Sequence, residues 1–248
     1  MNSSIAVQLY SVREFTEKDF AGTVRKIAAM GYAGVETAGF PGTTAKAAGG
    51  LFKELGLAIS SAHSGLPVGK DQARILDEMD AIGCKRLVCP GVSALLFESM
   101  DGLKKAAHQL NEANQVCKEH GLSLGYHNHY KEFKVVERRT AFDILLELVD
   151  PDVFFQVDTY WAHVAGINVP ALVKKLGKRA PLLHIKDGPG EKEQPMLAVG
   201  EGVMDVPAIL TAAKGFCEWQ IVELDACDTD MLEAVKKSYQ YLAGLKIL

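Results

Sequence analysis

Residues 5–18 read IAVQLYSVREFTEK, an apolar run typical of a buried strand followed at once by a charged segment without glycine. An open, doubly wound α/β sheet carries a glycine-rich GxGxxG turn directly after its first strand, where the turn cradles a dinucleotide. This chain has no such turn after its first predicted strand. The stretch therefore favours the other arrangement of a parallel sheet, a closed barrel.

Seven further apolar runs follow, and a longer amphipathic stretch separates each from the next. They read AGVETA (33–38), LAISSAH (57–63), KRLVCPG (85–91), LSLGYHNH (122–129), DVFFQVDTY (152–160), APLLHIKD (180–187) and WQIVELD (219–225). Strict alternation of strands and helices predicts a parallel sheet. Eight strand–helix units in 248 residues match the size of a closed parallel (β/α)8 barrel. We therefore predict an α/β protein in which residues 1–248 form a single domain.

Glycine and proline indicate where the predicted helices begin and end. The helix patterns after the first and fourth strands stop at Gly31 and Gly121, because glycine is favoured just past a helix. Pro170 and Pro207 suit the first turn of a helix. The last helix is predicted over residues 228–243.

Composition disfavours several classes of protein. Hydrophobic residues make up 48% and charged residues 23% of the chain, which is typical of a globular rather than a disordered protein. The net charge of −4 disfavours nucleic-acid binding. No apolar run reaches the roughly 18 residues that a membrane helix needs, and no signal peptide is visible. The charge and the lack of a long apolar run lead us to expect no nucleic-acid or membrane partner. The five cysteines are an odd number without a CxxC pair, so we expect reduced thiols in a cytoplasmic protein.

Polar residues gather where the predicted strands end. Ligands of a (β/α)8 barrel bind at the C-terminal ends of its strands, and residues two apart on a strand point to the same side. The polar residues that share a side in this way are Gln8 with Tyr10, Ser61 with His63, His127 with His129, Gln156 with Asp158 and Tyr160, His184 with Lys186, and Glu223 with Asp225, while Glu36 ends the second strand alone. Burying so many ionisable groups is costly unless they pair or hold a metal. These imidazoles and carboxylates suit a divalent cation such as Mn²⁺, Zn²⁺, Co²⁺ or Mg²⁺.

Several of these residues also have simpler interpretations. A single histidine at the end of a strand is usually a hydrogen-bonded core or surface residue. Lys186 could form an ion pair with Asp158, Asp187 or Glu223, whereas a bound metal nearby would depress the pKa of its ammonium group. Trp161 could pack against a loop instead of facing a sugar ring.

Arg13 and the loop VGEGVMD (199–205) are the candidates for a phosphate site. Arg13 could equally lie in solvent at the start of a helix, and Gly200 or Gly202 could serve turn geometry alone. With no further phosphate cradle in the sequence, an unphosphorylated sugar is favoured. Three other histidines fall on predicted helices or loops and are expected to face solvent: His108, His120 and His163.

Eight short stretches, taken in order, carry a resemblance to a known family. They are QLYSVR (8–13), GYAGVE (31–36), SAH (61–63), GYHNHYKEF (125–133), QVDTYW (156–161), LLHIKD (182–187), VGEGVMD (199–205) and IVELD (221–225). The chain resembles the xylose isomerase-like TIM barrel superfamily of sugar phosphate isomerases and epimerases, and within it a subgroup that carries YHNH. The resemblance covers the whole chain and is more specific for the fold and the metal site than for a substrate.

Similar members of this superfamily bind a divalent metal at the ends of strands five to eight, which implies His127, Asp158, His184 and Glu223 as ligands here. Ketose 3-epimerases place a glutamate where His127 stands and pair it with the glutamate of strand eight, one base on each face of the sugar. The histidine at this position argues against a symmetric epimerisation by two carboxylates. Either His127 or His129 could complete the ligand set.

The resemblance implies a chemistry of proton abstraction α to a carbonyl through an enediolate that the metal stabilises. Glu223 is the first candidate for the base, with His127 or His129 as its partner on the other face. Lys186 could donate a proton or bind an oxyanion. The residues expected to line the substrate pocket are Gln8, Tyr10, Glu36, His63 and Trp161.

The function that the resemblance favours is a metal-dependent sugar isomerase or epimerase. The alternative, favoured by His127, is a metal-dependent lyase or hydrolase acting on 3-keto-sugars or 3-keto-glycosides. A non-catalytic sugar-binding barrel is less supported because Asp158, His184 and Glu223 are retained. An endonuclease IV-like DNA repair enzyme is also less supported, because Trp161 stands where that enzyme needs a further histidine. The expected partner is a small sugar or keto-sugar, and related proteins are often dimers or tetramers, which leaves a homo-oligomer open.

Overall fold

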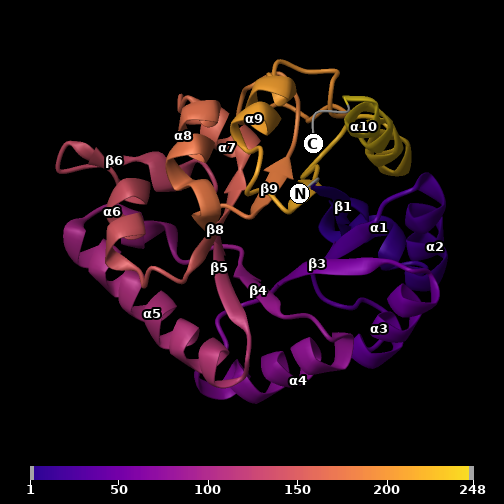
Figure 1. The fold of residues 1–248 in the computed structure, drawn as a ribbon, viewed down its shortest axis with the longest axis horizontal. Helices are drawn as coiled ribbons and strands as arrows, with labels where there is room; N and C mark the ends of the chain where they lie inside the picture. The colour runs from indigo at the N-terminus through magenta and orange to yellow at the C-terminus, as the bar shows by residue number, and fades with distance from the viewer. Residues whose placement is uncertain (1–2, 246–248) are drawn as a thin grey trace.

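Eight parallel strands close into a barrel in the computed structural model, which describes residues 3–245 (Figure 1). The order around the barrel is β1-β10-β9-β8-β5-β4-β3-β2. The strands are β1 (Ser4–Gln8), β2 (Gly34–Thr37), β3 (Ala58–His63), β4 (Arg86–Cys89), β5 (Ser123–His127), β8 (Phe154–Asp158), β9 (Leu182–Ile185) and β10 (Trp219–Val222). Each strand coincides with one of the eight apolar runs, so the predicted closed (β/α)8 barrel is confirmed.

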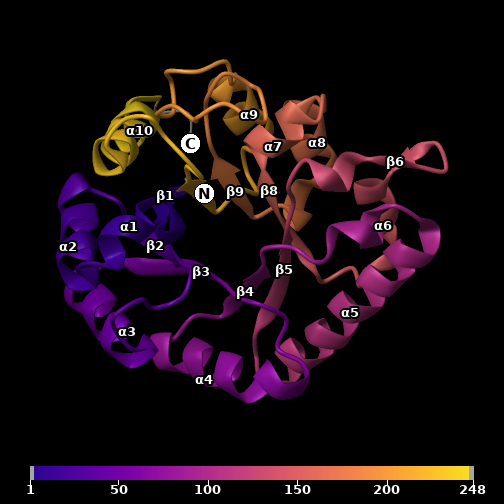
Figure 2. The ribbon, with the colours of Figure 1, turned by 180° about the vertical axis from the view of Figure 1, so that it is seen from behind.

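The helices form a ring around the barrel, as both views of the ribbon show (Figures 1 and 2). They are α1 (Arg13–Thr16), α2 (Phe20–Met30), α3 (Ala45–Glu54), α4 (Gln72–Ile82), α5 (Met100–Glu119), α6 (Ala141–Leu148), α7 (Thr159–Val164), α8 (Val169–Leu176), α9 (Val206–Ala212) and α10 (Met231–Leu245). Gly31 ends α2 in the left-handed conformation, at a φ of 104°, as its position in the sequence predicts. Pro170 and Pro207 lie in the first turns of α8 and α9. None of the helices in residues 3–245 is long and apolar enough to cross a bilayer.

Three segments differ from the sequence-based expectation. The first strand ends at Gln8, earlier than predicted, because the Gln8 side chain accepts a hydrogen bond from the backbone of Tyr10 (3.0 Å) and caps the 3₁₀ helix η1 (Leu9–Val12). The last helix begins at Met231 rather than Asp228, because the Asp230 side chain accepts a hydrogen bond from the backbone of Glu233 (2.9 Å) and caps it there.

The short strands β6 (Val135–Val136) and β7 (Arg139–Thr140) were not expected either. They form an antiparallel hairpin after β5.

Side chains inside the barrel form layers whose chemistry changes along the axis. The lower layer is an apolar cluster made of Ala6, Val88, Phe154, Leu182 and Ile221. Two residues further along the same strands stand Gln8, Pro90, Gln156, His184 and Glu223. Because residues two apart on a strand face the same way, a largely polar layer lies directly above an apolar floor. This arrangement places the ionisable side chains at the C-terminal mouth of the barrel.

Candidate metal centre and active site

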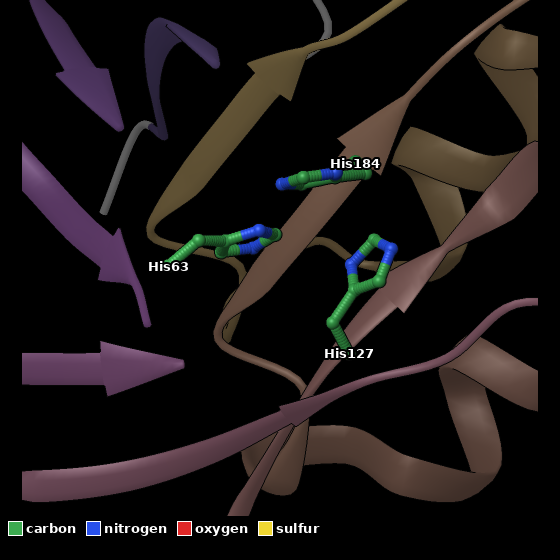
Figure 3. Close-up of side chains that lie close together, drawn as sticks. All are labelled: His63, His127 and His184. Carbon is green, nitrogen blue, oxygen red and sulfur yellow. The ribbon is translucent and has the colours of Figure 1, made fainter. Parts of the chain in front are cut away.

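The four residues predicted as metal ligands lie together at the mouth of the barrel. His127, Asp158 and His184 come from β5, β8 and β9, and Glu223 follows β10 directly. One ligand atom of each lies within 4.8 Å of the others, and all four residues are buried. Figure 3 shows His63, His127 and His184 converging from three strands on one space. The structure thus brings the four residues together, and their binding of a cation stays a prediction.

Two of the candidate ligand atoms, on His127 and Asp158, face each other without a hydrogen bond between them. His127 Nε2 lies 3.6 Å from Asp158 Oδ2. Asp158 Oδ1 accepts a hydrogen bond from the backbone of Trp161 (2.8 Å) and so caps α7. Oδ2 accepts no well-directed hydrogen bond from the described residues, although Lys186 Nζ lies 2.9 Å away. Burial raises the pKa of Asp158 to about 6, against the opposing effect of Lys186 and His184.

This geometry fits a divalent cation. Two ligands at about 2.1 Å from one ion can lie up to about 4.2 Å apart, and the 3.6 Å between His127 Nε2 and Asp158 Oδ2 falls within that range. Asp158 Oδ2 faces the Lys186 ammonium group at 2.9 Å but accepts no well-directed hydrogen bond within residues 3–245, so it keeps a lone pair for a metal ion. Two imidazoles and two carboxylates are donors that Mn²⁺, Zn²⁺ and Co²⁺ accept. His127, Asp158, His184 and Glu223 are therefore the residues that would hold the ion.

Glu36 is the hub of a hydrogen-bond network beneath the ligands. Its carboxylate accepts hydrogen bonds from Gln8 Nε2 (2.7 Å), Ser61 Oγ (2.5 Å), Gln156 Nε2 (2.5 Å) and His184 Nε2 (2.5 Å). These four bonds use all of its acceptor sites. Gln8 and Glu36 are fully buried and lie below the cavity. This position corrects the expectation that Gln8 and Glu36 line the substrate pocket. The Glu36 carboxylate and the Gln8 amide form hydrogen bonds with each other and with neighbouring residues of the site.

The network also sets the charges of Glu36 and His184. Burial opposes ionisation of Glu36, but the rings of His63 and His184 outweigh it and lower the Glu36 pKa to about 2. His184 is held between two carboxylates, because its Nδ1 lies 2.7 Å from Glu223 Oε2 and its Nε2 is bonded to Glu36. Burial opposes its protonation, but these carboxylates raise the His184 pKa to about 10.

Lys186 is fully buried beside three carboxylates. Its Nζ lies 2.9 Å from Asp158 Oδ2, 2.7 Å from Glu223 Oε2 and 2.8 Å from Asp225 Oδ2. Burial would lower the pKa of this ammonium group, but the three acids raise it well above its usual value. The ion-pair interpretation of Lys186 is confirmed for Asp158 and Glu223, with Asp225 in place of Asp187.

Above these residues lies a cavity of about 360 Å³. Its lining residues are Tyr10, Ala38, His63, Pro90, His127, His129, Glu223 and Asp225. The two carboxylates both follow β10, whereas the imidazoles belong to the β3 and β5 side of the barrel. The cavity thus has one acidic wall and one imidazole wall.

Of the remaining predicted pocket residues, Tyr10 lines the cavity and Trp161 does not. Arg13 packs over the Tyr10 ring at 4.2 Å and donates to the backbone oxygens of Tyr10 (2.9 Å) and Asp225 (2.8 Å). Arg13 is therefore a positioning residue rather than a free phosphate ligand. Trp161 Nε1 donates to Asp225 Oδ2 (3.1 Å), so its indole orients an acid of the cavity wall.

Asn128 and Glu132 were not among the predicted site residues, but they shape the β5 end of the site. Asn128 exchanges two hydrogen bonds with the backbone of Asp158, at 3.1 and 3.2 Å, and so ties the ends of β5 and β8 together. Buried Glu132 accepts from the Tyr126 hydroxyl (2.7 Å) and from the backbone of His129 (2.9 Å). Their place within GYHNHYKEF was the only available signal.

His129 faces the cavity from this loop. Its Nδ1 is buried without a hydrogen-bond partner among the described residues. Burial, with Lys186 and Lys131 nearby, lowers the pKa of its imidazole to about 4.

The loop VGEGVMD holds the carboxylate of Asp187 instead of a phosphate. Asp187 Oδ1 accepts from the backbone of Gly188 (2.9 Å) and Met204 (3.1 Å), and Oδ2 accepts from Gly200 (2.9 Å). A Cβ atom at Gly202 would lie 2.2 Å from Asp187 Oδ1, so glycine is required there by close packing. These glycines therefore serve the loop geometry. The three other histidines, His108, His120 and His163, are exposed as expected.

The fold and the site together define a class of protein, a (β/α)8 barrel with a candidate divalent-cation site at the C-terminal ends of its strands. The family model of the xylose isomerase-like TIM barrel matches residues 24–245. The chain belongs to this family, as the resemblance in its sequence predicted.

Known proteins similar to this chain carry several activities. Inosose dehydratase of Mesomycoplasma hyopneumoniae (strain 7448) is 31% identical over 166 residues, which are 56% of this chain and 53% of that protein. The chain thus spans about half the length of the curated relatives it matches. A sugar phosphate isomerase/epimerase from Parabacteroides distasonis has a TM-score of 0.83 at 24% identity, covering 100% of this chain and 96% of its own. An L-ribulose 3-epimerase has a TM-score of 0.72 at 15% identity, covering 98% and 94%.

Proposed function

We propose that this protein is a divalent-cation-dependent lyase that removes water from a keto-sugar or keto-polyol. The observation that carries the proposal is the asymmetry of the cavity. Both carboxylates that reach it, Glu223 and Asp225, lie on one wall, and the opposite wall offers imidazoles. The similarity to inosose dehydratase over 166 residues supports a dehydration.

The reaction is a β-elimination next to a carbonyl. Glu223 takes the proton from the carbon α to the carbonyl, the electron pair forms a carbon–carbon double bond, and the β-hydroxyl group leaves. The protonated Glu223 returns its proton to the departing hydroxyl, so one water is released and the carboxylate is regenerated. A bound divalent cation would polarise the substrate carbonyl as a Lewis acid. Both transfers use one wall of the cavity, which matches the position of Glu223.

The other residues hold the substrate and the base. Lys186 lies 2.7 Å from Glu223 Oε2 and fixes the carboxylate as it exchanges its proton. His63, His129 and Tyr10 line the cavity and offer hydrogen-bonding groups to hydroxyls of the substrate. These roles require no second carboxylate base.

The assay for this proposal supplies Mn²⁺, an inosose and a panel of ketoses and 3-keto-glycosides. The expected product is an unsaturated ketone that has lost one water, detected by its ultraviolet absorbance and its mass. Glu223→Gln should lower the rate by at least about 100-fold, because it removes the proton-transfer group. The matched control Glu233→Gln changes an exposed glutamate on α10 and should leave the rate unchanged. Full activity in Glu223→Gln would contradict the proposal.

A second candidate, an aldose–ketose isomerase, is favoured by the same single acidic wall. Glu223 could return the proton to the neighbouring carbon on the same face instead of to a leaving hydroxyl. In D₂O this reaction places deuterium in an isomeric sugar without loss of water. Epimerisation by two bases is less supported, because the wall opposite Glu223 carries His63 and His129 rather than a carboxylate.

A further inference from the structure

The amide of Gln156 contacts two imidazoles on one side and a carboxylate on the other. Gln156 Oε1 lies 2.6 Å from His63 Nε2 and 3.0 Å from His127 Nδ1. Gln156 Nε2 lies 2.5 Å from Glu36 Oε1. All of these groups except His63 are fully buried or nearly so, and no other hydrogen bond of this amide is made within residues 3–245. The orientation of one amide thus decides which hydrogens the two rings must carry.

The orientation is fixed by Glu36. An ionised carboxylate only accepts hydrogen bonds, so the NH₂ group of Gln156 must face it. The other three hydrogen bonds to Glu36 are consistent with a carboxylate that only accepts. Gln8, for example, accepts the backbone N–H of Tyr10 with its Oε1 and must therefore donate to Glu36 with its Nε2. Gln156 Oε1 consequently faces the imidazoles as an acceptor.

Each imidazole must then donate to Gln156. His127 carries its hydrogen on Nδ1, and its Nε2 is left with a free lone pair. That lone pair lies 3.6 Å from Asp158 Oδ2, which is paired with Lys186 on another side, so two acceptors face each other with no hydrogen between them. His63 carries its hydrogen on Nε2, the atom nearest to the network, and this nitrogen cannot ligate.

We propose that Glu36, acting through Gln156, is a positioning residue that selects the Nδ1–H tautomer of His127 and so presents Nε2 to a divalent cation. Glu36 also accepts from His184 Nε2, and Nδ1 of that ring is directed toward Glu223 Oε2, where a bound cation would take the place of the Nδ1 proton. One carboxylate therefore orients two ligands from beneath. The inference rests on the cation site of the proposed function, and it adds the residues that set the tautomer of His127.

The experiment compares Glu36→Gln with the matched control Ser61→Ala. A glutamine at position 36 brings an NH₂ group that needs an acceptor, so Gln156 turns over and presents its own NH₂ to the rings. His127 must then accept at Nδ1 and carry its hydrogen on Nε2. Ser61→Ala removes one bond to Glu36 Oε1 and leaves the amide orientation unchanged. Gln156→Met, which removes the shared acceptor, serves as a second variant if Glu36→Gln does not fold.

The first readout is the histidine ring signals in long-range ¹H–¹⁵N correlation spectra of the metal-free protein, with His127 assigned through His127→Gln. We expect Nδ1–H in the wild type and in Ser61→Ala, and Nε2–H in Glu36→Gln. Loss of the preference for Nδ1–H in Gln156→Met would also support the inference. An Nε2–H ring in the wild type, or an Nδ1–H ring in Glu36→Gln, would overturn it.

The second readout is Mn²⁺ affinity by competition with a fluorescent chelator. Glu36→Gln should weaken binding by about 10- to 100-fold, the usual effect of losing a group that orients a ligand, while Ser61→Ala should stay within about threefold. Unchanged affinity in Glu36→Gln would overturn the inference and leave the cation site intact. A wild-type protein that binds no divalent cation would overturn the cation site itself, a different result from a wrong tautomer.

Discussion

The buried ammonium group of Lys186 compensates the negative charges of several acids in the site. Its ammonium group contacts Asp158, Glu223 and Asp225, and no other lysine or arginine side chain makes an ion pair with these acids within the described residues. Removing one partner from a buried ion pair leaves uncompensated charge, which costs far more than losing a surface pair. The stability of the barrel mouth should therefore depend on Lys186.

We predict that Lys186→Met lowers the free energy of unfolding by about 3–5 kcal/mol without divalent cation. Added Mn²⁺ should restore part of this loss, because the ion supplies positive charge to Asp158 and Glu223. Urea unfolding with and without Mn²⁺ measures both effects. The control is Lys236→Met at an exposed position. A Lys186→Met protein as stable as the wild type would contradict the prediction.

Glu132 provides a pH-dependent contribution to stability. Burial raises the pKa of its carboxyl group above the ordinary value of 4.5, although the hydrogen bond from Tyr126 opposes the shift. Between 4.5 and the raised value the folded state holds more protons than the unfolded state, so stability falls as pH rises through this window. Glu132→Gln should lack this contribution. Unfolding free energies measured from pH 4 upward would refute the prediction if both proteins showed the same slope.

At the scale of single elements, β5 depends on a glycine that faces the barrel interior. A Cβ atom at Gly125 would lie 2.2 Å from the ring of Phe154 on the neighbouring strand β8. Phe154 belongs to the apolar floor under the polar layer. The absence of a side chain at Gly125 thus lets a large ring fill the barrel just below His127.

We predict that Gly125→Ala destabilises the protein by about 1–3 kcal/mol, the usual cost of overpacking a core. The double variant Gly125→Ala/Phe154→Leu should recover part of the loss, because the smaller side chain makes room for the added methyl group. Thermal unfolding of the single and double variants measures the coupling. Additive effects in the double variant would show that the two residues do not compete for the same space.

On the scale of the whole molecule, the candidate ligands join three barrel strands and the segment after a fourth. A cation bound by His127, Asp158, His184 and Glu223 would cross-link segments that lie far apart in the chain. Any ligand that binds only the folded state stabilises it, by about 2.7 kcal/mol at 100 times the dissociation constant.

Saturating Mn²⁺ or Co²⁺ should therefore raise the Tm of the metal-free wild type by about 5–10 °C, given a shift of roughly 2–4 °C per kcal/mol for a protein of this size. A chelator should reverse the shift. Asp158→Asn, which loses a ligand charge, should show little response. Scanning calorimetry tests the expectation. A wild-type Tm that stays the same with every divalent cation tested would contradict the cation site.

The sequence by itself determined the eight strands and the side of the barrel on which the functional groups gather. Both follow from local rules: apolar runs of strand length alternate with helices, and residues two apart on a strand face the same way. His127, Asp158, His184 and Glu223 could therefore be grouped in advance, with help from a family resemblance.

Only the tertiary structure decided the position of each polar group along the barrel axis and the partner with which it pairs. Gln8 and Glu36 lie beneath the cavity, Lys186 pairs with Asp225, and Trp161 orients that acid instead of facing the cavity. These facts depend on how neighbouring strands are offset along the barrel axis. That offset is set by the closure of all eight strands at once, so no single stretch of sequence contains it.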